Sequence, residues 1–136
     1  MSQANPANSS SPRRGERGSV TIELVILLPA LFAIMFLGMQ AALYYHARTV
    51  AIAAAEEGAR ATGAENGHQV DGVRAAASFI TNAGGDSVLE NTTETANRTS
   101  TTASVTIRGS SLSVIPGWHP RIVQSASVTV ERVTTP

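Results

Sequence analysis

The spacing of hydrophobic residues changes along the chain, and each change marks a different element. Residues 24–45 form a run of 22 residues without a formal charge. A helix rises about 1.5 Å per residue, so this run can cross a hydrocarbon core of about 30 Å. The alternative is a buried core helix, but the rest of the chain is rich in Ala, Thr and Ser and has too few large apolar side chains to surround it. The sequence therefore predicts a membrane helix whose transmembrane part is about 22–46.

Small apolar residues continue beyond this run at spacings of three and four, which predicts that the same helix extends to residue 62. A stripe of small side chains lets a partner backbone come close. On another face Glu57 and Arg60 can pair. Gly63 ends the helix, and a second short helix is predicted over residues 70–82, followed by two glycines. The stripe consists of Ala47, Val50, Ala51, Ala54, Gly58 and Ala61.

Toward the C-terminus the period becomes two, which is typical of strands with one buried face. Strands are predicted at 103–108 and 126–131, and 87–96 is a weaker third candidate because its apolar positions are few. Residues 115–120 contain two prolines and a glycine, which predicts a loop. Its Trp118, the only Trp, either caps the sheet or is exposed for contact with a partner. The fold class is therefore α+β: a long N-terminal membrane helix that continues outside the membrane, a short second helix, and a small antiparallel sheet of two to three strands.

Basic residues immediately before the apolar run indicate its orientation. The positive-inside rule keeps Arg13, Arg14 and Arg17 cytoplasmic and sends the C-terminal part across the membrane. The run is long for a secretory signal peptide, and no good small-x-small cleavage site follows it, because Gln40 stands two residues before Ala42 and Tyr45 two residues before Ala47. We expect a single-pass protein of the cell membrane with a cytoplasmic N-terminus and an extracytoplasmic C-terminus. Its expected parts are a disordered basic leader (1–18), a long helix (19–62) and a small extracytoplasmic α/β module (63–136).

Composition excludes several classes of function. Ten basic and ten acidic residues cancel, so no strong net field is available to hold nucleic acid. The absence of Cys excludes disulfides, thiolate metal sites and Cys nucleophiles. His46, His68 and His119 do not have the spacing of metal ligands, and the sequence contains no nucleophile elbow or phosphate-binding glycine loop. We therefore expect no enzyme activity, cofactor, metal or nucleic-acid partner.

Glu23, at the start of the apolar run, is the main candidate for a specific interaction. A carboxylate there costs up to a few kcal/mol unless it is paired or reaches the interface. One interpretation is an interfacial side chain that benefits from the helix N-terminus. The other is a residue whose partner arrives on assembly. After a cut between Gly18 and Ser19, Glu23 would be the fifth residue of the mature chain, and the new amino group of Ser19 on a neighbouring chain would neutralise it.

Gly18, a small residue after it, Glu23 and an apolar helix together resemble the prepilin pattern of type IV pilins and pseudopilins. Residues 19–29 resemble more closely the start of TadE-like proteins, minor pilins of the Tad (tight adherence, Flp-type) pilus. That family has a Glu followed six residues later by a Pro within the membrane helix, and Glu23 and Pro29 match both positions. The leader of 18 residues is long for the pattern, which leaves open whether the cut falls at Gly18. Two later strings are similar to actinobacterial members: 113–117 and 125–132.

The resemblance implies a structural or assembly component of a Tad-type type IV pilus. It implies processing by a prepilin peptidase between Gly18 and Ser19, and a role of Glu23 and Pro29 in assembly. The implied partners are the membrane, other pilin or pseudopilin subunits, Tad assembly-platform proteins and the peptidase. The alternative is an uncleaved single-pass signal-anchor protein with an extracytoplasmic binding module. The offset between Gly18 and Glu23 favours the pilin.

Overall fold

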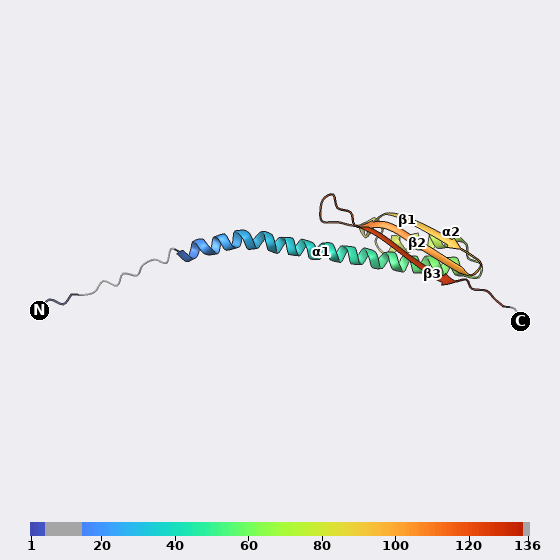
Figure 1. Cartoon of the computed structure of the whole chain (residues 1–136), viewed down its shortest axis with the longest axis horizontal. Helices are drawn as coiled ribbons and strands as arrows, with labels where there is room; N and C mark the ends of the chain where they lie inside the picture. Colours follow the sequence, from blue (N-terminus) through green and yellow to red (C-terminus); the bar gives the residue numbers. More distant parts are fainter. Residues whose placement is uncertain (5–14, 135–136) are drawn as a thin grey trace. The chain divides into compact units, whose positions relative to one another are not determined.

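The computed structural model describes residues 1–4 and 15–134, with side chains from residue 18 onward in the first helix. The elements are α1 (Gly15–Gly63), α2 (Gln69–Asn82), a short 3-10 turn η1 (Gly85–Ser87), and the strands β1 (Leu89–Arg98), β2 (Thr102–Ser111) and β3 (Arg121–Thr129). The predicted α+β class is thus confirmed, with an antiparallel sheet in the order β1-β2-β3 (Figure 1). The chain divides into two compact units, Met1–Met35 and Phe36–Pro136.

The first unit contains the beginning of α1. The predicted disordered leader falls mostly on residues 5–14, which lie outside the described part of the chain. The last residues of the leader are already helical, because α1 begins at Gly15. α1 also remains helical through Pro29, although a proline removes one backbone donor and frees the carbonyl of Val25.

The strands of the sheet in the second unit cover more residues than the alternation of apolar and polar positions predicted. The weak candidate at 87–96 is confirmed as β1, which pairs with β2 along its length apart from a register shift between Glu90 and Thr93. β3 begins at Arg121, five residues earlier than the predicted strand. Its first apolar pair explains the difference: Ile122 is buried and Val123 is exposed on the other face. Two adjacent apolar residues hide a period of two, so the sequence did not show this part of the strand.

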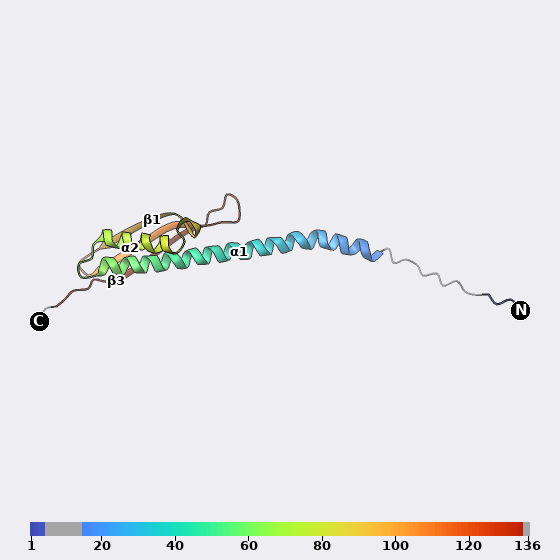
Figure 2. The ribbon, with the colours of Figure 1, turned by 180° about the vertical axis from the view of Figure 1, so that it is seen from behind.

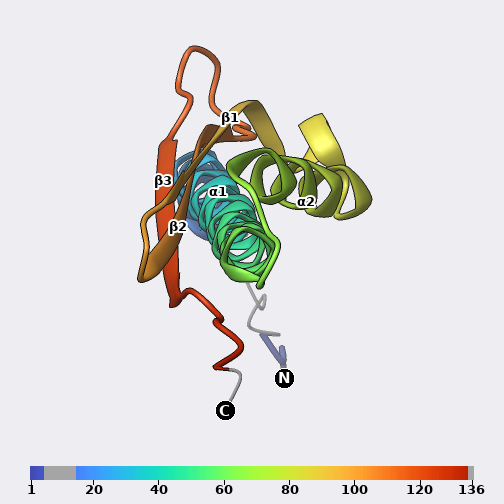
Figure 3. The ribbon, with the colours of Figure 1, turned by 90° about the vertical axis from the view of Figure 1, so that its right-hand side faces the viewer.

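The stripe of small residues in α1 is buried within the chain itself, apart from its last member, Ala61, which is half-buried. The C-terminal half of α1 has the sheet on one side and α2 on another (Figure 3). Small side chains allow both layers to approach the helix closely, and together with larger residues of the strands they form one apolar core. The partner backbone that the stripe predicted is therefore supplied by this chain. The core contains Ala47, Val50, Ala51, Ala54, Ala55, Ala76, Ile80, Leu89, Val105, Ile107 and Ile122.

Two glycines form the contact between α1 and α2. A Cβ atom on Gly58 would lie 2.8 Å from the carbonyl oxygen of Gly72 and 3.1 Å from Cγ1 of Val105. A Cβ atom on Gly72 would lie only 1.8 Å from Oγ1 of Thr62. That buried hydroxyl donates a hydrogen bond of 2.9 Å to the carbonyl of Gly58. The backbones can approach this closely only because neither glycine has a side chain.

Gly58→Ala is expected to lower the free energy of unfolding by about 1–3 kcal/mol, the usual cost of overpacking a close contact. Alanine favours a helix by about 1 kcal/mol over glycine, so any loss must come from the clash with Gly72 and Val105. Gly38→Ala is the matched control, because no atom lies within 4 Å of a Cβ added there. The free energy of unfolding of both variants is obtained from denaturation curves of the detergent-solubilised full chains, monitored by circular dichroism. Equal stability of the two variants would contradict the close contact between α1 and α2 at Gly58.

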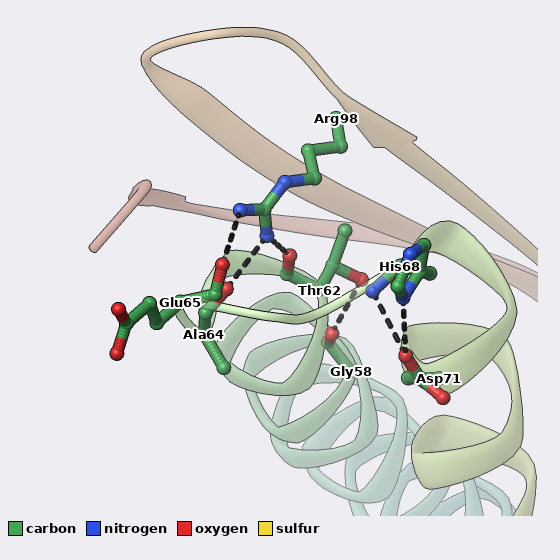
Figure 4. A network of polar contacts seen from close by, with 7 residues as sticks. All are labelled: Gly58, Thr62, Ala64, Glu65, His68, Asp71 and Arg98. Atoms are coloured by element: carbon green, nitrogen blue, oxygen red, sulfur yellow. Dashed lines mark hydrogen bonds and ion pairs between the residues drawn. The ribbon is translucent and has the colours of Figure 1, made fainter. Parts of the chain in front are cut away.

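Arg98, the last residue of β1, binds the C-terminal end of α1 (Figure 4). Its Nη1 donates hydrogen bonds to the carbonyl oxygens of Thr62 and, at 2.9 Å, of Ala64. The last carbonyls of a helix have no partner within the helix and carry partial negative charge, so a guanidinium is well suited to them. His68 is the N-cap residue that precedes α2, and its backbone N–H donates to Oδ2 of Asp71 at 2.8 Å.

Candidate functional site

The N-terminal half of α1 is the first candidate site, because no described part of the chain covers it. Its most apolar window of 18 residues has a mean hydropathy of 2.6, and none of that window is buried. A soluble protein rarely exposes so large an apolar surface. By length and composition α1 can therefore cross a membrane once. Side chains in this exposed part include Leu24, Ile26, Leu31, Ile34 and Leu37.

The predicted processing site, Gly18 and Ser19, lies on α1 near its beginning. Both residues are exposed, and no atom lies within 4 Å of a Cβ added to Gly18. The bond between them is therefore not covered by any described part of the chain. Helix ends fray, which gives an enzyme access to a bond so close to Gly15.

Glu23 is exposed on α1, among apolar neighbours. Within residues 18–134, whose side chains are described, no ion pair reaches its carboxylate. Glu23 lies eight residues after Gly15, about two turns into the helix. The favourable effect of a helix N-terminus fades within the first turn, so it stabilises this carboxylate little in the full-length chain. An interfacial position of Glu23 would therefore depend on contact of its carboxylate with water, because the helix N-terminus contributes little.

The remaining predicted site residues are placed only in part. Arg13 and Arg14 lie outside the described residues. The backbone of Arg17 belongs to α1, but its side chain is not described. Pro29 lies within α1, six residues after Glu23, on the same exposed apolar segment. The structure therefore does not bring the predicted site residues together around a common cavity; they follow one another along the helix.

A second candidate site, which the sequence analysis missed, centres on Gln40. Only 3% of this residue is exposed, although it lies on α1 near the end of the apolar run. Its Oε1 accepts hydrogen bonds from the backbone N–H of Val114 at 2.9 Å and from Oγ of Ser113 at 3.0 Å. Its Nε2 donates to the carbonyl oxygen of Leu112 at 3.3 Å. A single side-chain amide thus fixes the start of the loop between β2 and β3 against α1.

An apolar groove of about 370 Å³ lies beside this contact, between α1 and the same loop. Trp118 forms part of its wall and is 50% exposed, so the alternative in which Trp118 is exposed fits better than a buried cap on the sheet. One signal in the sequence could have pointed here. Gln40 is the only side-chain amide in the apolar run, and such a group needs a partner when water is excluded. The residues that line the groove are Leu37, Gln40, Ala41, Tyr44, Tyr45, Trp118 and Pro120.

The titratable groups of the second unit lie in separate places. His119 approaches Glu90, with 3.5 Å between Nδ1 and Oε2, and His68 is engaged at the start of α2. Arg60 pairs with Glu57 at 3.3 Å, as predicted, and with Glu56 at 3.6 Å. Both of these ion pairs are exposed and contribute little to stability. Among the residues whose positions are described, no three His, Asp or Glu side chains gather in a way that could hold a metal ion.

Comparison with known proteins identifies one family. Residues 18–60 match the model of the TadE-like proteins. The match begins at Gly18 and includes Glu23 and Pro29, so it confirms over these residues the resemblance drawn from the sequence. It ends before α2 and the sheet, and it covers about a third of the chain. No curated protein and no solved structure matches the chain.

Proposed function

We propose that this chain, whose first helix is TadE-like over residues 18–60, is a minor pilin or pseudopilin of a Tad-type pilus. The N-terminal half of α1 anchors it in the cell membrane, and the α+β part lies on the extracytoplasmic side. One observation carries the proposal: the family match coincides with a helix whose apolar window is not buried by any described part of the chain. Such a surface suits lipid in the membrane and the helices of other subunits after assembly, because both surroundings are apolar.

The two parts of α1 support this division of roles. From Ala47 onward the helix packs in the core against the sheet and α2, so this part of α1 belongs to the folded module. Before Leu37 the described side chains of α1 are exposed and remain available to other molecules. One continuous helix thus joins an anchor whose described side chains are exposed to a folded module. This is the architecture expected of a subunit that assembles through its N-terminal helix.

Orientation, processing and partners are further parts of the proposal. Arg13, Arg14 and Arg17 hold the N-terminus in the cytoplasm. A prepilin peptidase cuts between Gly18 and Ser19. The mature chain then associates through Glu23 and the apolar helix with other pilin or pseudopilin subunits and with the platform proteins of the Tad system.

An epitope tag after Pro136 tests both the orientation and the pilus role. In intact cells that assemble a Tad pilus, antibody is expected to reach this tag, and the tag is expected in the sheared pilus fraction. The control is the same tag inserted after Ser2 in cells without prepilin peptidase, where the leader is retained; this tag should become accessible only when the membrane is permeabilised. A C-terminal tag that is accessible only after permeabilisation would contradict the orientation. Normal piliation in cells that lack the chain, together with a pilus fraction free of the tag, would contradict the pilus role.

A further inference from the structure

We infer that the loop between β2 and β3, residues 112–120, lies in the headgroup region at the extracytoplasmic face of the membrane and inserts Ile115 and Trp118 among the lipids. The inference rests on the proposed membrane span of α1. It adds a second point of membrane contact, far from the helix in sequence, and it fixes how deep the helix sits.

The level of the loop along α1 is set by Gln40. Its three hydrogen bonds to Leu112, Ser113 and Val114 hold the start of the loop beside this residue. The groove next to it is lined on the helix side by residues from Leu37 to Tyr45. Figures 1 and 2 show the loop extending past the ends of the strands at the level of this stretch of α1, and Figure 3 shows its tip projecting away from the helix. The predicted transmembrane part ends at about residue 46, so the loop lies at the level of its last turns.

The loop has the chemistry of a membrane interface. Its tip is a turn in which the N–H of Trp118 donates to the carbonyl of Ile115 at 3.2 Å. Gly117, at φ +77°, occupies the position of a type II turn that favours glycine. The apolar side chains on either side of the tip are exposed, Ile115 by 36% and Trp118 by 50%. Residues 112–118 carry no charged side chain. Trp and Tyr prefer the boundary between lipid and water, because an apolar ring lies beside a polar group.

The backbone of the loop limits its depth. Peptide groups that are not paired within the protein cannot enter hydrocarbon, where water is unavailable to them. The loop therefore stops among the headgroups, and the hydrocarbon edge lies near Gln40. A core of about 30 Å takes about 20 helical residues, so its other edge lies near Thr21. The span is then shifted toward the N-terminus relative to residues 22–46, and Glu23 lies within the edge of the hydrocarbon.

Lipid suits the groove better than a helix from a second copy. The groove is lined on the helix side from Leu37 onward, and the large apolar side chains of α1 that precede Leu37 in sequence are exposed and would face lipid in the proposed span. Two tyrosines and Trp118 border it, which is the composition of an interfacial belt. A lipid acyl chain fills such an irregular space without a matching shape.

Trp118 is the only Trp in the chain, so its fluorescence reports on the loop alone. The full chain is reconstituted in vesicles of phosphatidylcholine and phosphatidylglycerol that carry bromine at a shallow or at a deep acyl position. We expect shallow bromine to quench Trp118 at least twice as strongly as deep bromine, and acrylamide in the water to quench it weakly. The reference chain carries Trp118→Phe and Val133→Trp. Val133 is exposed in the C-terminal tail, so its Trp should be quenched by acrylamide and not by brominated lipid.

Strong quenching of Trp118 by acrylamide without quenching by brominated lipid would overturn the inference, because the loop would then lie in water. Protection from both quenchers would also overturn it, because another protein segment would then cover the groove. Strongest quenching by deep bromine would overturn the headgroup placement. Extraction of the vesicles at alkaline pH tests the membrane span separately. A chain that resists extraction while Trp118 remains in water disproves the loop contact and leaves the proposed function intact.

Discussion

A chain that carries Gly18→Leu is expected to keep its leader in a cell with prepilin peptidase, whereas the wild-type chain loses its first 18 residues. The peptidase acts beside a small residue, and a bulky side chain at that position should block the cut. The structure makes the variant informative, because no atom lies within 4 Å of a Cβ at Gly18. Leucine there leaves the described contacts of the fold intact. Intact mass and N-terminal sequencing of the membrane form give the result.

Gly38→Leu is the matched control for this experiment. Gly38 also lies on α1 with open space around it, but twenty residues beyond the proposed cut. Its chain should be processed like the wild type. A wild-type chain that retains its leader in a peptidase-positive cell would contradict the processing proposal and favour the uncleaved signal anchor.

Much of the fold could be predicted because its signals are local. The apolar run, the stripe of small residues and the alternation of Val105 and Ile107 with polar neighbours each indicate their own element. β1 was the weakest candidate because its positions are mostly polar on both faces, and only Leu89 at its start is fully buried. The local pattern does not show that this segment pairs with β2. The hydrogen bonds to β2 keep it in a strand although its apolar and polar residues alternate poorly.

The contacts between distant residues could not be predicted in this way. Gln40 bonds to residues 72 to 74 positions away, and no local pattern pairs an amide with a loop backbone. In the sequence Gly72 is an unfavourable residue within a helix. The fold explains it, because Thr62 lies so close that there is no space for a side chain at position 72. In the sequence Arg98 is one charged residue in a polar strand. Only the fold brings its guanidinium to the carbonyl groups that have no helical partner at the end of α1. Each of these residues acquires its role only from the tertiary arrangement.

The proposed site residues show the opposite pattern. Gly18, Glu23 and Pro29 stand out in the sequence, but in the single chain they lie exposed and in succession along one helix. Their proposed partners are other molecules: a peptidase for Gly18, and a neighbouring chain for Glu23. A motif can indicate such a role before any contact exists, because it reflects what the helix meets in an assembly.

Glu23→Gln is expected to leave expression, membrane insertion and cleavage intact and to reduce incorporation into the pilus more than tenfold. Within the described residues its carboxylate has no ion pair, so the folded chain loses little when the charge is removed. Removing a charge from the apolar segment should even ease insertion. In the proposed assembly, the variant loses the partner of the Ser19 amino group on a neighbouring mature chain. Breaking a buried pair costs about 3–5 kcal/mol, because the other charge is left uncompensated. Each 1.4 kcal/mol corresponds to about a tenfold change in an equilibrium.

Glu57→Gln provides the matched control for the role of Glu23. Glu57 also lies on α1, but its ion pair with Arg60 at 3.3 Å is exposed to water and is worth at most about 1 kcal/mol, so assembly should be unchanged. The chain has no Cys, and Val20→Cys therefore gives a single crosslinking site in the first turn of the mature subunit. Crosslinked dimers in the membrane and subunit in the pilus fraction are compared for the wild type, Glu23→Gln and Glu57→Gln. If Glu23→Gln crosslinks and assembles like the control, its carboxylate is only an interfacial side chain. If only Glu23→Gln loses both signals, while its mature N-terminus is still Ser19, the carboxylate acts between subunits after processing.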